Sequence, residues 1–267
     1  MLIRATPDVR GDTHEKISTG QADSKFGFSM ADVPAAIDRV RRIDGLALEG
    51  VHAHIGSQIM ELDPFRREAT ALARIGEGVG EFSIYDLGGG LGVAYTDTQH
   101  PPDIEEWVGA LVGAAHEAGI PADARLLVEP GRALTANAGV TLYTVESVKR
   151  NVSTWVGCDG GMSDNLRPML YGAVYEAHLA DRFGGETPCV LTGKHCESGD
   201  VIVRDALLDH PKPGDVVVVP ATGAYGFAMA SNYNGVPRPP VLFCRDGNAR
   251  VVVRRESFEE LTARDVR

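Results

Sequence analysis

Hydrophobic and polar positions over the first half of the chain alternate between two periods. Apolar runs typical of strands are followed by segments with helical spacing, such as the one containing Ile37 and Val40. Gly45 is expected to end that helix, and Asp63 is the expected N-cap of the next. The pattern predicts strands over 2–7, 46–56, 82–90 and 125–131, and helices over 29–45, 62–78 and 103–119. Successive strand–helix units predict parallel strands covered by helices.

The rhythm changes after about residue 140. Short β-rich runs follow, separated by Gly, Pro and Asp. Residues 245–250, RDGNAR, predict a hairpin turn between two of these runs. We therefore expect a β/α domain over residues 1–140 and an antiparallel β domain over residues 141–267.

The number of predicted parallel strands limits the fold of the first domain. Four strands are too few to close a β/α barrel, which takes about eight. The first predicted strand begins at residue 2 with no segment before it. We expect the C-terminal half of a (β/α)8 TIM-type barrel, followed by an antiparallel β-sandwich or barrel domain, and we expect the sequence to be a fragment.

Charge and composition exclude several classes of partner. The net charge is −11 and no basic stripe is present, which argues against nucleic acid. No apolar run is long enough to cross a bilayer, and the N-terminus has no signal-peptide pattern. The four cysteines show neither disulfide nor metal-ligand spacing, so we expect a cytoplasmic protein without a structural metal.

Candidate chemistry gathers where the predicted strands end. The sequence DLGGGLG at 86–92 favours a phosphate-binding turn and a plain tight turn about equally. His52 and His54 share one face of a strand, but no third metal ligand has suitable spacing. Arg132 in VEPGR could bind a carboxylate or phosphate, or form a surface ion pair.

The second half contributes a cysteine in a polar setting. Cys196 in GKHCESGD could be a nucleophile, a proton donor or a bystander, because Lys194 favours its thiolate and Glu197 opposes it. Residues 160–173 and 221–235 carry arginine and tyrosine side chains with no mechanism that follows from residue type alone.

Seven motifs occur together and in order: SKFGF, HAHIGSQ, DLGGGLG, EPGR, GGMSDNLRPMLYGA, GKHCESGD and ATGAYGFAMASNYN. Together they closely resemble the diaminopimelate decarboxylases, which belong to the alanine-racemase-like, fold-type III class of pyridoxal 5'-phosphate (PLP) enzymes. The resemblance runs from residue 2 to the C-terminus. It implies a homodimer with active sites at the subunit interface, and decarboxylation of meso-diaminopimelate to L-lysine in lysine biosynthesis.

The resemblance also implies roles for individual residues. Glu129 would pair with the ring nitrogen of PLP, which lets the ring accept the electrons released with CO2. The full set implied at the cofactor is His54, which stacks on the ring, with Ser57, Gly88, Gly89, Gly90, Glu129, Pro130, Gly131, Arg132 and Tyr225.

On the substrate side, the resemblance implies contacts by Arg132, Arg167, Tyr171, Glu197 and Tyr225. Arginines suit a dicarboxylate, because one carboxylate must be held while the other leaves. Cys196 corresponds to the general acid that reprotonates the α-carbon, delivered from the opposite subunit.

One feature departs from the resemblance. The family attaches PLP to a lysine on an early barrel strand, and none of the five lysines here has that setting. We expect the isolated chain to lack this attachment. Two alternatives stay open: a related ornithine- or arginine-type decarboxylase, and a truncated non-catalytic paralogue.

Overall fold

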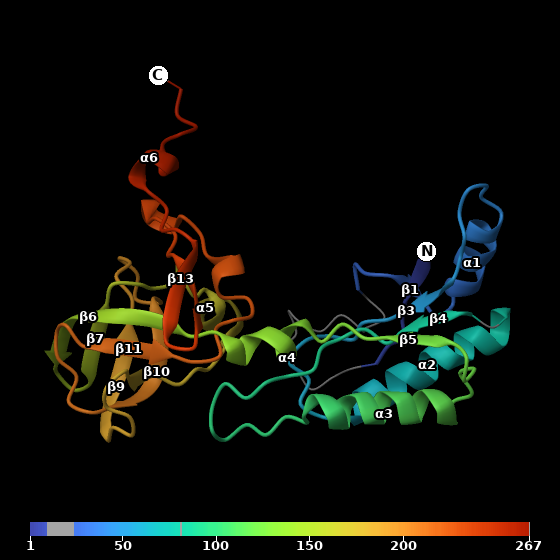
Figure 1. The fold of residues 1–267 in the computed structure, drawn as a ribbon, viewed down its shortest axis with the longest axis horizontal. Coiled ribbons are helices and arrows are strands. Elements are labelled where there is room, and N and C mark those ends of the chain that lie inside the picture. The colour runs from blue at the N-terminus through green and yellow to red at the C-terminus, as the bar shows by residue number, and fades with distance from the viewer. Residues whose placement is uncertain (10–23, 81, 267) are drawn as a thin grey trace. The chain divides into compact units, whose positions relative to one another are not determined.

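The computed structural model describes residues 1–9, 24–80 and 82–266, and it divides into two compact units (Figure 1). The first unit comprises Met1–Ala94 and Thr98–Leu134. The second comprises Tyr95–Asp97 and Thr135–Arg267. The division after Leu134 lies close to the expected boundary at residue 140, but three residues from within the β/α half belong to the second unit.

The first unit is built on a parallel sheet with the strand order β2-β1-β3-β4-β5. Its strands are β1 (Leu2–Thr6), β2 (Phe28–Ser29), β3 (Gly50–His52), β4 (Ile84–Asp86) and β5 (Arg125–Leu127). The four predicted strands are confirmed as elements, and the two-residue β2 was missed. β3, β4 and β5 are each shorter than predicted, and the backbone leaves the ladder at His52, Asp86 and Leu127.

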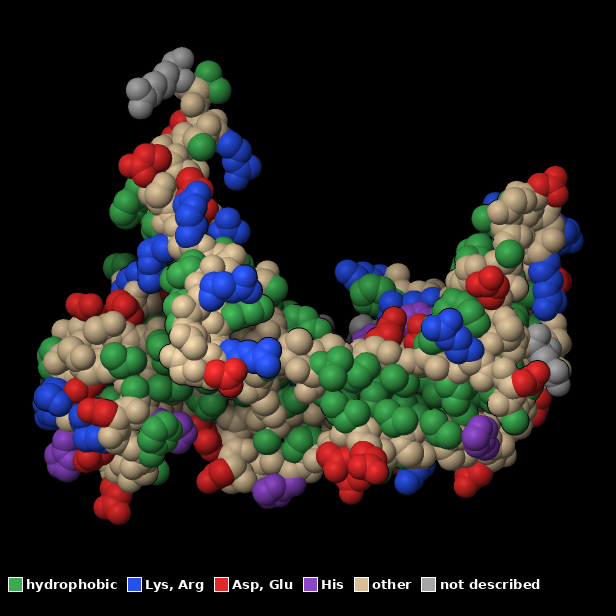
Figure 2. All heavy atoms as spheres, in the orientation of Figure 1, with side chains coloured by type: hydrophobic (Ala, Val, Ile, Leu, Met, Phe, Trp, Pro, Cys, Tyr) green, Lys and Arg blue, Asp and Glu red, His purple; other side chains and the backbone are tan. Residues whose placement is uncertain are grey.

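Three helices accompany this sheet: α1 (Val33–Arg41), α2 (Asp63–Val79) and α3 (Ile104–Glu117). Their apolar faces join the core, where the rings of Phe65 and Trp107 meet edge to face at 5.6 Å. Hydrophobic side chains also gather on the surface along α3 (Figure 2). Two helix boundaries differ from prediction. Leu62, not Asp63, is the N-cap at the start of α2, and α1 ends at Arg41, before Gly45.

The second unit contains a six-stranded sheet with the order β10-β9-β7-β6-β11-β8. Its strands are β6 (Thr141–Arg150), β7 (Thr154–Cys158), β8 (His178–Leu179), β9 (Thr187–Thr192), β10 (Val201–Leu208) and β11 (Val216–Val219). Most neighbours are antiparallel as expected, but β7 and β9 pair in parallel. The expectation of a purely antiparallel domain is therefore wrong at this pair.

The predicted hairpin is confirmed. β12 (Val241–Arg245) and β13 (Asn248–Val253) pair antiparallel across Asp246 and Gly247. These two residues have φ values of 51° and 74°, as a two-residue hairpin turn of type I′ requires. The remaining short helices are α4 (Gly131–Thr135), α5 (Arg167–Tyr171) and α6 (Phe258–Leu261), with 3-10 turns at Ala136–Ala138, Phe227–Met229 and Tyr233–Gly235.

Candidate functional site

Three strand ends of the first unit come together around the glycine turn. The N–H of Gly88 donates to Asp86 Oδ1 at 3.0 Å, and the N–H of Gly89 donates to His54 Nδ1 at 3.2 Å. The N–H of Glu129 donates to the carbonyl of Gly88 at 2.7 Å. Parallel pairing of β3, β4 and β5 produces this convergence, because their carboxyl ends lie on one edge of the sheet.

The glycines of this turn are required by close backbone packing. A Cβ at Gly89 would lie less than 3.0 Å from the carbonyl of Glu129, and one at Gly90 would lie as close to that of Gly56. Gly88 and Gly90 also have φ values of +60° and +110°, which favour glycine. Close packing and backbone conformation thus account for these glycines, and the phosphate-binding interpretation of DLGGGLG stays a prediction.

His54 is held in one protonation state. Burial lowers the pKa of its imidazole, and the nearby Arg4 guanidinium lowers it further. The neutral ring fits the hydrogen bond from Gly89, because Nδ1 must be unprotonated to accept that N–H. The remaining proton of the neutral tautomer is then on Nε2.

Glu129 lies beside a histidine that the sequence pattern did not connect to it. His52 Nε2 is 3.5 Å from Glu129 Oε2. His52, Asp86 and Glu129 place their ligand-type atoms within 4.8 Å of one another. Asp86 was overlooked as a neighbour of His52 because they are cross-strand partners on β3 and β4, 34 positions apart.

The EPGR segment positions a buried arginine. Arg132 is 6% exposed, and its Nε and Nη2 donate to Ser57 Oγ at 3.2 and 2.8 Å. The predicted residues Ser57 and Arg132 are thus in direct contact. A Cβ at Gly131 would meet no atom within 4 Å, so space is open next to this residue.

The predicted residues of the second unit form their own arrangement. Arg167 is 4% exposed, and its Nη1 donates to the hydroxyl of Tyr175. Its guanidinium also lies 4.6 Å from the centre of the Tyr95 ring. Tyr171 ends the same helix, α5, and is half-buried.

Cys196 and Glu197 are exposed on the loop between β9 and β10. His195, the residue before them, points inward, is buried, and places its Nε2 3.0 Å from Ser163 Oγ. Within this motif, His195 is therefore part of the interior, whereas Cys196 and Glu197 face the surface.

Tyr225 has a backbone conformation that is uncommon for a bulky residue. Its φ is 58°, in the left-handed region, and its side chain is largely exposed. Such strain costs on the order of 1–3 kcal/mol and is concentrated at functional sites. Ala221 and Asn234 in the same segment also have positive φ values, of 57° and 55°.

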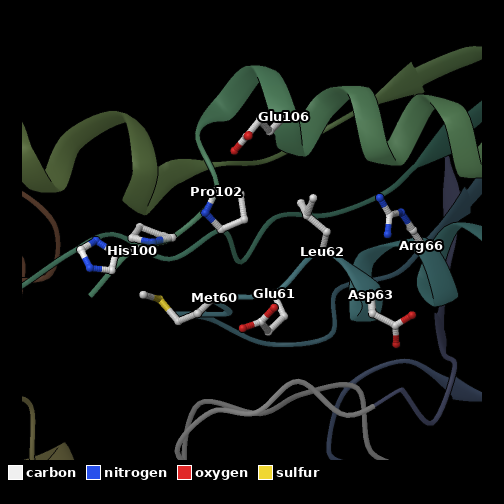
Figure 3. A pocket seen from close by; sticks show the side chains of 9 residues that line it. Met60, Glu61, Leu62, Asp63, Arg66, His100, Pro102 and Glu106 are labelled. Atoms are coloured by element: carbon white, nitrogen blue, oxygen red, sulfur yellow. The ribbon is translucent and has the colours of Figure 1, made fainter. Parts of the chain in front are cut away.

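A pocket of about 440 Å³ lies elsewhere in the first unit, between residues 60–66 and 100–106 (Figure 3). Its lining mixes charged and apolar side chains: Met60, Glu61, Leu62, Asp63, Arg66, His100, Pro101, Pro102 and Glu106. None of the predicted site residues lines it. Glu106 is occupied in the N-terminal capping box of α3 with Asp103.

Known proteins resemble the chain over its whole length. It is 44% identical to diaminopimelate decarboxylase of Mycobacterium bovis, over 100% of this chain and 65% of that protein. The crystal structure of diaminopimelate decarboxylase from M. jannaschii in complex with L-lysine matches with a TM-score of 0.91 and 32% identity, covering 100% of this chain and 63% of that one. The chain thus spans somewhat less than two thirds of the length of these relatives.

A more distant match is the lysine/ornithine decarboxylase of Vibrio vulnificus complexed with putrescine. Its TM-score is 0.70 at 26% identity, over 80% of this chain and 59% of that one. No helix in the described part of the chain is long and apolar enough to cross a membrane. The family model for the pyridoxal-binding domain of pyridoxal-dependent decarboxylases matches residues 1–136, and the chain belongs to this family.

Proposed function

We propose that the protein carrying this chain is a PLP-dependent decarboxylase that converts meso-diaminopimelate to L-lysine and CO2. The observation that carries the proposal is the convergence of His54, the 88–90 turn and Glu129 in a chain of this family. The names of the relatives identified over its whole length support the choice of substrate.

The first unit has the donors and acceptors that PLP requires. Bound PLP supplies an electron sink for the bond that breaks to release CO2. Glu129, whose carboxylate is half exposed, would pair with the ring nitrogen of PLP, and His54 would stack on the ring. Arg132 with Ser57, and the open space at Gly131, suit a phosphate group.

The substrate-side assignments stay predictions. Cys196 is proposed to deliver a proton from its thiol to the α-carbon after CO2 leaves. Its exposure makes it accessible to another molecule or subunit. Glu197 is proposed to bind the distal ammonium, and Tyr171 and Tyr225 to line the substrate site.

Arg167 is proposed to act on the retained carboxylate of the substrate. Its contacts with Tyr175 and Tyr95 hold the guanidinium in one orientation, which favours a geometrically specific ion pair. The same contacts mean that truncating Arg167 would also disturb packing.

Several further features of the proposal are expected from the sequence and from the resemblance. The parallel sheet of the first unit is proposed to be part of a β/α barrel, and the protein to be a homodimer with active sites shared between subunits. A β-sandwich or barrel description of the second domain, with the domain boundary near residue 140, also stays a prediction. So does a cytoplasmic location, expected from the cysteine usage.

An ornithine-type activity is less well supported. The ornithine-type structure matches less of the chain, with a lower TM-score, than the diaminopimelate-type structure does. The glutamate in CES also differs from the aspartate usual after this cysteine in ornithine-type relatives. A non-catalytic protein is the remaining alternative, and an activity measurement separates it from the others.

A substrate panel tests this proposal. The PLP-loaded protein is incubated with meso-diaminopimelate, L-ornithine, L-arginine or L-lysine, and CO2 release is measured. We expect release from meso-diaminopimelate at least about 100-fold faster than from the others, because a site built for a second charged group rejects substrates that leave it unpaired. Release from ornithine but not from meso-diaminopimelate would contradict the substrate assignment.

A further inference from the structure

We propose that Asp200 is a positioning residue that ties the loop carrying Cys196 to the loop carrying Arg167. The inference rests on the proposed function, since it gives Asp200 a part in placing a proton donor and a substrate contact. The Cys196 loop is defined as residues 193–200 and the Arg167 loop as residues 160–167. Both loops lie in the second unit.

One carboxylate connects the two loops directly. Asp200 is 2% exposed and immediately precedes β10. Its Oδ1 accepts the N–H of Met162 at 2.8 Å, and its Oδ2 accepts the N–H of His195 at 2.9 Å. Each oxygen therefore holds one loop.

Backbone hydrogen bonds complete the connection. The N–H of Lys194 donates to the carbonyl of Gly160 at 2.9 Å, which joins the loops a second time. The N–H of Gly193 donates to the carbonyl of Asp200 at 3.0 Å and closes the base of the Cys196 loop. The N–H of Asp200 donates to the carbonyl of Glu197 at 3.1 Å. The ends of the loop are fixed, while Cys196 between them is exposed.

Two glycines make room for the carboxylate. A Cβ at Gly193 would lie less than 3.0 Å from Asp200 Oδ2, and so would one at Gly161. Gly161 also has a φ of +155°, which an L side chain rarely adopts. Gly161 and Gly193 are thus explained by the close approach of Asp200.

His195 adds a third anchor to the same loop. Its buried imidazole contacts Ser163 Oγ through Nε2, and its ring lies 5.5 Å from the ring of Tyr233. The side chain before Cys196 therefore holds the loop from inside. Cys196, the next residue, is exposed at the surface.

The chemistry at this position calls for aspartate. Two backbone N–H groups arrive from different loops, and a carboxylate offers an acceptor oxygen to each. Hydrogen bonds to a charged acceptor are about twice as strong as neutral ones. An asparagine of the same shape would turn an N–H2 donor toward one of those N–H groups. A displacement of about 1 Å in a positioned catalytic group can cost about 100-fold in rate.

The test compares Asp200→Asn with the matched control Asp205→Asn in the PLP-loaded protein. Asp205 lies on β10 and is exposed, so its variant makes the same charge change away from the loops. Three quantities are measured: amide hydrogen exchange at Met162 and His195, the rate of Cys196 alkylation by iodoacetamide, and kcat with KM for meso-diaminopimelate.

For Asp200→Asn we expect exchange at both amides to be faster by about 10-fold or more, an altered alkylation rate, and a kcat lower by about 10- to 100-fold with a smaller change in KM. Asp205→Asn should match the wild type. Exchange within about 2-fold of wild type in a folded Asp200→Asn protein would overturn the proposal, as would faster exchange with unchanged alkylation and kcat.

If the wild-type protein has no decarboxylase activity, the proposed function fails. The exchange and alkylation results then decide the role of Asp200 alone. If Asp200→Asn does not fold, exchange in the wild-type protein decides: strong protection of both amides supports the connection, and exchange at the unprotected rate at either one overturns it.

Discussion

Burial shifts the pKa of single side chains near the glycine turn. It lowers the pKa of His54, which favours the neutral imidazole that the hydrogen bond from the N–H of Gly89 requires. It raises the pKa of Glu68 well above the usual value, and the neighbouring Asp86 adds to that rise, while Arg4 opposes it. Glu68 is fully buried, and neither carboxylate oxygen has a hydrogen-bond partner among the described residues.

Glu68 gives the protein a distinct dependence of stability on pH. Its folded-state pKa lies above the unfolded value of about 4.5, so the folded state binds more protons between the two values. Stability from this group is therefore complete below about pH 4.5 and is lost as the pH rises toward the folded-state pKa. Urea unfolding is measured across this pH range. The free energy of unfolding should fall less with rising pH for Glu68→Gln than for wild type. Identical pH slopes would contradict the prediction.

The carboxylate of Glu129 is expected to be needed for chemistry more than for folding. Its side chain is half exposed, and its near neighbour is His52. Glu129→Gln should lower kcat by about 100- to 1000-fold, the usual effect of removing one preorganised electrostatic group. Its unfolding midpoint should match that of Glu117→Gln, an exposed control on α3. Near wild-type kcat in Glu129→Gln would remove Glu129 from the proposed site.

At the scale of elements, the hydrophobic pattern predicted which segments form strands and helices. It did not predict every pairing between the strands. Parallel strands alternating with helices and the Asp246–Gly247 hairpin turn could be predicted, because both depend on local periodicity and turn chemistry. The parallel pairing of β7 with β9, the contact of His52 with Asp86 and the reach of Asp200 to Met162 could not. These contacts join segments far apart in sequence, and no local pattern encodes them.

Three glycine-to-alanine variants distinguish glycines that backbone packing requires from a glycine that leaves room for a ligand. Gly89→Ala should destabilise the fold by more than about 1 kcal/mol, because its Cβ would collide with the backbone of Glu129. Gly113→Ala, inside α3 with open space, should stabilise it by about 0.5–1 kcal/mol.

Gly131→Ala is the informative variant of the series. A Cβ there meets nothing within 4 Å, so unfolding should change little. PLP affinity, measured by equilibrium dialysis, should fall if the phosphate occupies this space. Unchanged affinity in Gly131→Ala would place the phosphate elsewhere.

At the scale of the whole molecule, each of the two units contains part of the predicted site. His54, Gly88–Gly90, Glu129 and Arg132 belong to the first unit, and Cys196 with Arg167 to the second. The lysine that would carry PLP has no match among the five in this chain, of which Lys16 lies outside the described residues.

The proposal that active sites are shared between subunits makes a prediction about mixed subunits. Glu129→Gln and Cys196→Ala proteins, each inactive alone, are unfolded together, refolded in equal amounts and assayed. Half of a random population of dimers would contain both variants, and one of their two sites would be intact, so activity should recover to about 25% of wild type. No recovery from correctly refolded dimers would show that each site is built within one subunit.

The most direct test of the proposed activity is the formation of L-lysine from meso-diaminopimelate by the purified full-length protein that carries this chain, with and without PLP. The account predicts one L-lysine for each CO2, only when PLP is present, and a loss of at least about 100-fold in Glu129→Gln. A folded protein that binds PLP and forms no L-lysine would contradict it.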